Sequence, residues 1–125
     1  MDIIKITIQK QRDFFNSKST LDIDFRKSQL QKLYAEIKKN EREILNAVKK
    51  DLNKSAFEGY LSEIGMVYEE INFMIKNIKK LSKPQKHKTP LMHFPSTTHT
   101  YCDPFGCVLI MSPWNYPFNL TISPL

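Results

Sequence analysis

Hydrophobic residues recur every three or four positions along the first part of the chain, which is the spacing of amphipathic helices. The longest such stripe consists of Leu61, Ile64, Tyr68, Ile71, Ile75 and Ile78. This stripe predicts a helix that packs along another element, and Gly65 within it permits a close approach of that element. We expect the helix to end before Pro84, because proline cannot continue a helix.

Shorter stripes of the same kind predict three helices upstream, over residues 3–16, about 24–39 and 41–52. The last two are placed as separate helices because of the residues between them. Asn40 is a suitable N-cap, and Glu43 follows three positions later, as in a capping box. The amino-terminal part of the chain is therefore predicted to contain four helices.

The pattern changes after residue 82. Residues 82–95 are rich in proline and lysine without any periodicity, which predicts a linker. Residues 96–102 are rich in β-formers and predict an exposed strand, followed by a turn at residues 103–106. Residues 107–111 are continuously apolar, which is typical of a buried parallel strand that is covered on both faces.

Composition and charge narrow the class of protein. A chain of 125 residues with 41% hydrophobic residues is long enough for one domain with a core. The net charge is +6, and lysines gather between Lys76 and Lys88. No aromatic residue is interleaved among them, so we interpret this stretch as a solvated helix end and linker, and we expect no nucleic-acid partner.

The sequence carries no sign of export. Its first residues lack the apolar segment of a signal peptide, and no run approaches the roughly 18 apolar residues of a membrane span. We therefore expect a cytoplasmic protein, with no membrane association encoded in this segment. In that compartment Cys102 and Cys107 are expected to be reduced, packed thiols without a disulfide.

Few side chains in the helices and linker suggest chemistry. The histidines and Cys102 have no spacing typical of zinc ligands, so we predict no metal site. Three carboxylates of the fourth helix are expected on its solvent-exposed face: Glu63, Glu69 and Glu70. The candidate chemistry is therefore concentrated near the carboxyl end of the chain.

The turn after the apolar run is the most distinctive part of the sequence. Its residues Pro113-Trp114-Asn115-Tyr116-Pro117 resemble the Pro-Trp-Asn-x-Pro signature of the NAD(P)-dependent aldehyde dehydrogenase superfamily. The continuation to Ile122 looks most like the class 3, fatty-aldehyde type branch. The helices and the linker before the turn also have suitable lengths, so the resemblance covers the whole chain as the amino-terminal part of such an enzyme.

The resemblance implies an α/β fold, in which amino-terminal helices and the first strand belong to an incomplete, Rossmann-like cofactor-binding domain. Residues 1–82 would be its helical part, residues 83–104 a linker and oligomerisation-arm strand, and residues 105–125 the first buried strand, the Trp-Asn turn and the start of the next helix. The alternative is a mostly α-helical bundle with a hairpin. We favour the α/β fold because a buried strand needs neighbours on both sides, and this chain has only one other strand to offer.

The same resemblance assigns roles within the turn. Asn115 would donate its side-chain N–H to the oxyanion that forms when a thiolate attacks an aldehyde, an interaction worth about 3 kcal/mol. The competing interpretation is that Asn115 caps a helix that begins at Tyr116 or Pro117. Tyr116 would lie beside the substrate entrance. The resemblance also implies a cleft for NAD or NADP, lined by Met111, Ser112, Pro113 and Trp114.

The implied function is oxidation of aldehydes to carboxylic acids through a cysteine thiohemiacetal, in an enzyme that is a homodimer in its full-length form. The catalytic cysteine and general-base glutamate of the family have no counterpart here, since Cys102 and Cys107 do not occupy the place of the nucleophile. We therefore expect the 125-residue chain alone to be inactive. The alternative is a non-enzymatic helical interaction or oligomerisation module, supported by the stripe at 61–78 and the unpaired strand edge at 96–102.

Overall fold

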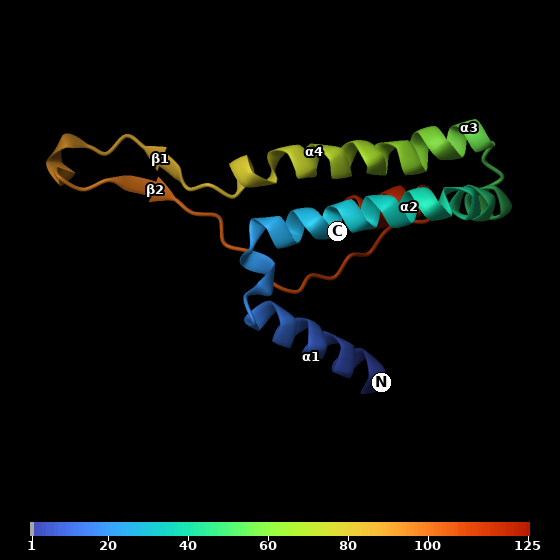
Figure 1. The fold of residues 1–125 in the computed structure, drawn as a ribbon, viewed down its shortest axis with the longest axis horizontal. Helices are drawn as coiled ribbons and strands as arrows, with labels where there is room; N and C mark the ends of the chain where they lie inside the picture. The colour runs from blue at the N-terminus through green and yellow to red at the C-terminus, as the bar shows by residue number, and fades with distance from the viewer. Residues whose placement is uncertain (1) are drawn as a thin grey trace.

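The computed structural model describes residues 2–125, so Met1, the first residue of the predicted 1–82 part, lies outside them. Its α-helices are α1 (Asp2–Asn16), α2 (Ile23–Leu52), α3 (Ala56–Gly59), α4 (Gly65–Leu81) and α5 (Asn119–Ile122). Shorter helical turns are η1 (Ser19–Leu21), η2 (Tyr60–Ile64) and η3 (Leu91–His93), and the strands are β1 (Gln85–His87) and β2 (Thr98–Thr100). Helices α2 and α4 lie side by side, and α1 leads away from them (Figure 1).

Helix α2 is one continuous helix, so the predicted break at Asn40 is wrong. The helix begins after Asp22, whose Oδ1 accepts a hydrogen bond from the backbone N–H of Asp24 at 2.8 Å. It ends at Asn53, which adopts a left-handed conformation with φ 54°. The Asn40 side chain donates to the carbonyl of Glu36 at 2.8 Å, one turn earlier in the same helix. Apolar residues before and after Asn40 pack on the same core, which keeps the helix intact.

The core lies between α2 and α4. Its buried residues are Ile37, Ile64, Val67, Tyr68 and Ile71. Partly buried side chains complete it: Leu30, Leu33, Tyr34, Ile44, Leu45, Ile75, Phe118 and Ile122. The predicted stripe is thus confirmed from Ile64 onward, but its first residue, Leu61, is 60% exposed.

A π-helical turn, η2, explains why the stripe fails at its start. The N–H of Gly65 donates to the carbonyl of Tyr60, five residues earlier, so this turn contains one residue more than an α-helical turn. One extra residue rotates the preceding positions by roughly 100° about the helix axis. Leu61 therefore faces solvent, whereas Glu63 is buried. A Cβ on Gly65 would lie 3.1 Å from the Tyr60 carbonyl oxygen. Glycine at this position therefore avoids a tight contact with the backbone of the π-helical turn.

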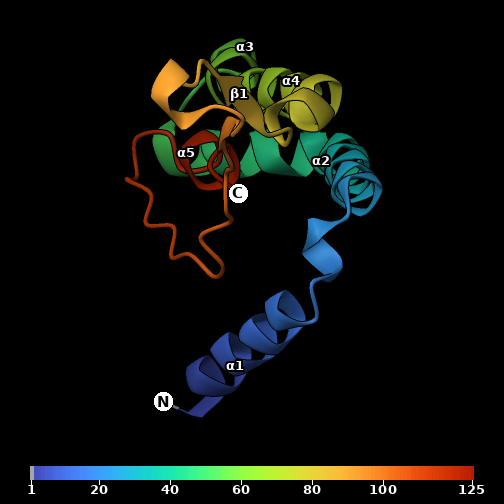
Figure 2. The same cartoon turned by 90° about the vertical axis from the view of Figure 1, so that its left-hand side faces the viewer.

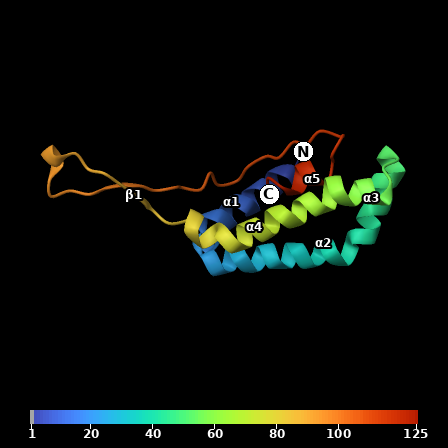
Figure 3. The ribbon, with the colours of Figure 1, turned by 90° about the horizontal axis from the view of Figure 1, so that it is seen from above.

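Strands β1 and β2 form an antiparallel hairpin that projects away from the helices (Figures 1 and 3). The strand expected at residues 96–102 is confirmed in its centre as β2. Its partner β1 lies within the predicted linker, where no strand was predicted. Both faces of β1 are exposed, and a strand without a buried face shows no alternation in its sequence. The hairpin tip carries exposed apolar side chains at Leu91, Met92 and Phe94.

Residues 101–116 contain no helix or strand, and they return from the hairpin to α5 (Figure 2). The buried strand predicted at residues 107–111 is therefore not formed, and Leu109 and Met111 are 81% and 83% exposed. A strand requires a neighbour, and the strands that the structure describes pair only with each other. Cys102 and Cys107 are free and exposed, which corrects the expectation of packed thiols.

Candidate functional site

The turn that contains Asn115 is held by a lysine from the helical body, which consists of α2, α3, η2 and α4. Lys54 follows the end of α2, and its Nζ donates to the carbonyl oxygen of Asn115 at 2.9 Å. The same Nζ lies 4.0 Å from the centroid of the Tyr116 ring, in a cation–π contact. One ammonium group therefore contacts two consecutive residues of the turn.

Lys54 is itself held by a buried carboxylate. The distance from Lys54 Nζ to Glu63 Oε1 is 2.6 Å, and the two side chains are 10% and 0% exposed. The other oxygen, Glu63 Oε2, accepts the backbone N–H of Asn119 at 3.0 Å. Both carboxylate oxygens thus have charged or polar partners, as a buried charge requires. The prediction that Glu63 lies on the solvent-exposed face is wrong, whereas Glu69 and Glu70 are exposed as predicted.

Helix α5 is fastened to η2 by a further hydrogen bond, and the side chain that makes it is held by a second one. The Asn119 side chain donates to the carbonyl of Ser62 at 3.1 Å, and Ser123 Oγ donates to Asn119 Oδ1 at 2.8 Å. On the upstream side of the turn, the hydroxyls of Ser112 and Thr121 lie 2.6 Å apart. The turn is therefore bound at both of its ends.

Asn115 itself is exposed, and its side-chain amide makes no hydrogen bond with any residue from 2 to 125. The competing interpretation of Asn115 as a helix cap is wrong. Helix α5 begins at Asn119, its N-cap residue is Phe118, and no side chain caps it. The Asn115 amide carries two N–H donors, and both are available to an oxygen that approaches from outside.

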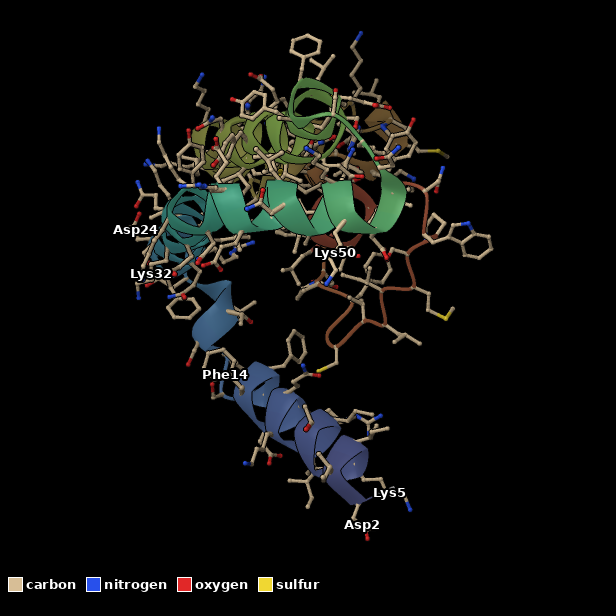
Figure 4. All side chains as sticks on the ribbon, turned by 90° about the vertical axis from the view of Figure 1, so that its right-hand side faces the viewer. Asp2, Lys5, Phe14, Asp24, Lys32 and Lys50 are labelled. Carbon is tan, nitrogen blue, oxygen red and sulfur yellow. The ribbon has the colours of Figure 1, made fainter. Side chains whose placement is uncertain are left out.

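The residues predicted to line a cofactor cleft lie in residues 101–116, which we call the irregular segment because they contain no helix or strand. Met111 and Trp114 are 83% and 85% exposed, and Ser112 and Pro113 are exposed as well. Figure 4 shows the side chains of this segment projecting into open space. Tyr116 is 40% exposed, with its ring against Lys54. The structure thus brings Asn115 and Tyr116 together with Lys54, whereas among residues 111–114 the side-chain hydrogen bond within residues 2–125 is that of Ser112 to Thr121.

Sequence reasoning missed Lys54, Glu63 and Asn119. Asn119 lies within the matched run 113–122, which could have drawn attention to it. Glu63 precedes Val67 by one helical turn, and this placement puts a carboxylate beside a buried apolar position. Lys54 carries no signal of its own, because its partner in the turn, Asn115, is 61 residues away.

Residues 2–125 hold neither a metal-ion cluster nor a membrane-spanning helix. No group of three or more histidine, cysteine, aspartate or glutamate side chains in this range could hold a metal ion. No helix in the same range has the length and apolar character needed to cross a membrane.

Comparisons with known proteins agree with one another. The model of the aldehyde dehydrogenase family matches residues 2–125. The 4,4'-diaponeurosporen-aldehyde dehydrogenase of Staphylococcus aureus is 42% identical over 125 residues, which cover 100% of this chain and 27% of that protein. Aldehyde dehydrogenase family 3 member B1 of Bos taurus is 38% identical, with the same two coverages of 100% and 27%.

A solved structure extends the likeness to the fold. The substrate-bound state of Staphylococcus aureus AldH matches with a TM-score of 0.96 and 41% sequence identity, over 99% of this chain and 27% of that chain. The chain therefore spans 27% of the length of these relatives. The match to the amino-terminal part of such a protein confirms the predicted fold class, an incomplete α/β domain.

Proposed function

Because the chain belongs to the aldehyde dehydrogenase family, we propose that it acts within an NAD(P)-dependent enzyme that oxidises aldehydes to carboxylic acids. The chain corresponds to the amino-terminal part of a family 3 protein. The observation that best supports a catalytic contribution is the state of Asn115. Its backbone is fixed by Lys54, whereas its side-chain amide is exposed and has no partner among residues 2–125.

Asn115 would act on the oxygen of the aldehyde. When a cysteine thiolate attacks the carbonyl carbon, a carbon–sulfur bond forms and the carbonyl electron pair moves to oxygen. The Asn115 Nδ2–H would donate to this oxyanion. A donor that is fixed before the reaction needs no reorganisation when the charge develops, and such a donor is worth about 3 kcal/mol.

The backbone of the segment Met111–Trp114 has free hydrogen-bonding groups that suit the binding of NAD or NADP. No backbone–backbone hydrogen bond within residues 2–125 involves residues 111–114, so their C=O groups, and the N–H groups of all but Pro113, are available to a ligand. Bound there, the cofactor would supply the hydride acceptor. Tyr116, whose ring rests on Lys54, would border the entrance for the aldehyde.

The β1–β2 hairpin would serve as the dimer arm of the enzyme. Its strands are exposed, and each has an edge that no other strand within residues 2–125 pairs with. Exposed apolar side chains at Leu91, Met92 and Phe94 are 88%, 85% and 80% accessible at its tip. A second copy of the chain could cover them. Residues 1–125 alone would lack activity, because neither Cys102 nor Cys107 lies among the contacts of the Asn115 turn.

The test of this proposal is Asn115→Ala in a full-length enzyme that carries this chain at its amino end. Such an enzyme is the native protein or this chain joined to the remaining length of the Staphylococcus aureus relative. With a long-chain aldehyde and NAD or NADP, we expect kcat to fall about a hundredfold or more while KM changes little. Asn40→Ala is the matched control, because Asn40 bonds only within α2. An unchanged kcat for Asn115→Ala would contradict the proposal.

A further inference from the structure

We propose that Lys54 and Glu63 are positioning residues that set the place of Asn115 for catalysis. This inference rests on the proposed function, because it names the residues that hold the proposed oxyanion donor in place. Neither side chain would touch the aldehyde. Each would act through the backbone of the turn.

Lys54 has three close partners, two of which belong to the turn. Its ammonium group lies 2.6 Å from Glu63 Oε1, 2.9 Å from the Asn115 carbonyl oxygen and 4.0 Å from the centroid of the Tyr116 ring. An ammonium group has three N–H donors, and three close partners restrict where it can lie. The backbone at Asn115 is therefore placed by a nearly buried charge that comes from outside its own segment.

Glu63 ties the far end of the same turn. Its Oε1 binds Lys54, which holds Asn115, and its Oε2 accepts the N–H of Asn119 at 3.0 Å. One carboxylate thus fixes both ends of a five-residue stretch, from 115 to 119. The π-helical turn η2 is what brings this carboxylate inward, and such turns are frequent at functional sites.

Stability alone gives a poor account of this pair. Moving two charges out of water is unfavourable, and apolar residues of similar volume are often as stabilising as a buried ion pair, or more so. An apolar pair, however, could not direct a donor at the Asn115 carbonyl. Placement is important for catalysis, because a displacement of about 1 Å in a reacting group can lower the rate roughly a hundredfold.

The test is a mutant cycle in the full-length enzyme. Lys54→Met with Glu63→Gln removes both charges together, and the glutamine can still accept the Asn119 N–H. We expect kcat to fall roughly tenfold to a hundredfold, with little change in KM. Combined with Asn115→Ala, the same pair of substitutions should lower kcat little further, because the group that it positions is already absent.

The matched control removes the same charges from exposed positions of α4. Lys79→Met with Glu70→Gln should leave kcat, KM and the coupling to Asn115→Ala unchanged. A purely structural role for the Lys54–Glu63 pair would instead lower the melting temperature and the fraction of active enzyme. It would not make the losses of kcat per active site non-additive.

The outcomes separate this inference from the proposed function. A large loss in Asn115→Ala together with full additivity, or a wild-type kcat in the Lys54–Glu63 variant, would overturn the positioning role and leave the proposed function intact. No loss in Asn115→Ala would overturn both. If the paired variant does not fold, Lys54→Arg is measured, since arginine keeps the ion pair but presents its donors in a fixed planar fork. A wild-type kcat in Lys54→Arg would overturn the positioning role.

Discussion

The helical body buries its apolar side chains, whereas the irregular segment exposes them. In the body, Ile64 and Val67 are 0% exposed, and α2 and α4 cover each other. In the segment, Phe105 is 99% exposed and Trp114 is 85% exposed. The body therefore closes its own core, whereas the segment presents a surface that only another element or another chain could cover.

The candidate site lies at the boundary between these two regions. Downstream of Asn115, the turn and α5 are fastened to the body through Lys54 and Glu63. Upstream, residues 105–114 have the apolar composition of a strand but no neighbouring strand in the part of the chain that the structure describes. The difference indicates that the body fixes the backbone at Asn115 by itself, while the proposed cofactor cleft needs the rest of a sheet.

The largest effect should come from a cavity in the body. Ile64→Ala removes a fully buried side chain from the contact between α2 and α4, and we expect a loss of about 2–5 kcal/mol in the free energy of unfolding. Leu109→Ala in the exposed segment is the control and should change this free energy by less than about 0.5 kcal/mol. Urea titration of the chain, followed by circular dichroism, measures both. Equal losses in the two variants would erase the distinction between body and segment.

A smaller effect is expected for Tyr68→Phe, which tests a polar contact in the same body. The Tyr68 hydroxyl donates to Glu41 Oε2 at 2.9 Å, and the ring lies 4.6 Å from that of Tyr34 between centroids. Loss of a hydrogen bond to a carboxylate should lower the free energy of unfolding by about 1.5–3 kcal/mol. Tyr101→Phe is the control, because Tyr101 is exposed.

The same tyrosine predicts a pH dependence. Burial, and then the hydrogen bond to Glu41, raise the pKa of Tyr68 above its ordinary value of about 10. The unfolded chain therefore releases this proton at a lower pH than the folded chain does. The stabilisation is fully present below pH about 10 and is lost as the pH rises beyond it. A Tyr68→Phe variant that loses stability above this pH as steeply as the wild type would contradict this assignment.

Much of the body could be predicted from the sequence, because helical periodicity reports directly on burial. The stripe from Ile64 to Ile78 is an example. The wrong predictions for the body have local causes that the spacing of apolar residues does not reveal. Asn40 with Glu43 resembles a capping box, but the apolar pattern continues across it and packing keeps α2 whole. The π-helical turn shifts the phase by one residue, which exposes Leu61 and buries Glu63.

The candidate site was predicted only where a rare local motif exists. Asn115 and Tyr116 belong to the Pro-Trp-Asn-x-Pro run, which a single sequence displays. Lys54 is 61 residues away from Asn115, and a contact at such a separation depends on the complete fold. The strand expected at residues 107–111 could not form for the same kind of reason. Its sequence requires neighbours that the described residues do not provide.

The smallest effect on folding, and the sharpest contrast with the body, is expected at the hairpin tip. Leu91→Ser with Met92→Ser should change the free energy of unfolding by less than about 0.5 kcal/mol, because both side chains are more than four-fifths exposed. In the full-length enzyme, the same change should weaken the proposed dimer roughly a hundredfold or more, since burying each such side chain contributes about 1.5–3 kcal/mol.

Sedimentation velocity over a range of concentrations measures this dissociation, and Met66→Ser on α4 is the control, because Met66 is exposed on the body itself. An unchanged dissociation constant in the hairpin variant would show that the tip is not the dimer arm. A loss of folding stability as large as that of Ile64→Ala would show that the hairpin belongs to the closed body. Only weaker association with an unchanged free energy of unfolding supports the contrast between the hairpin tip and the body. An exposed surface that a second copy covers stabilises the dimer and not the fold of one chain.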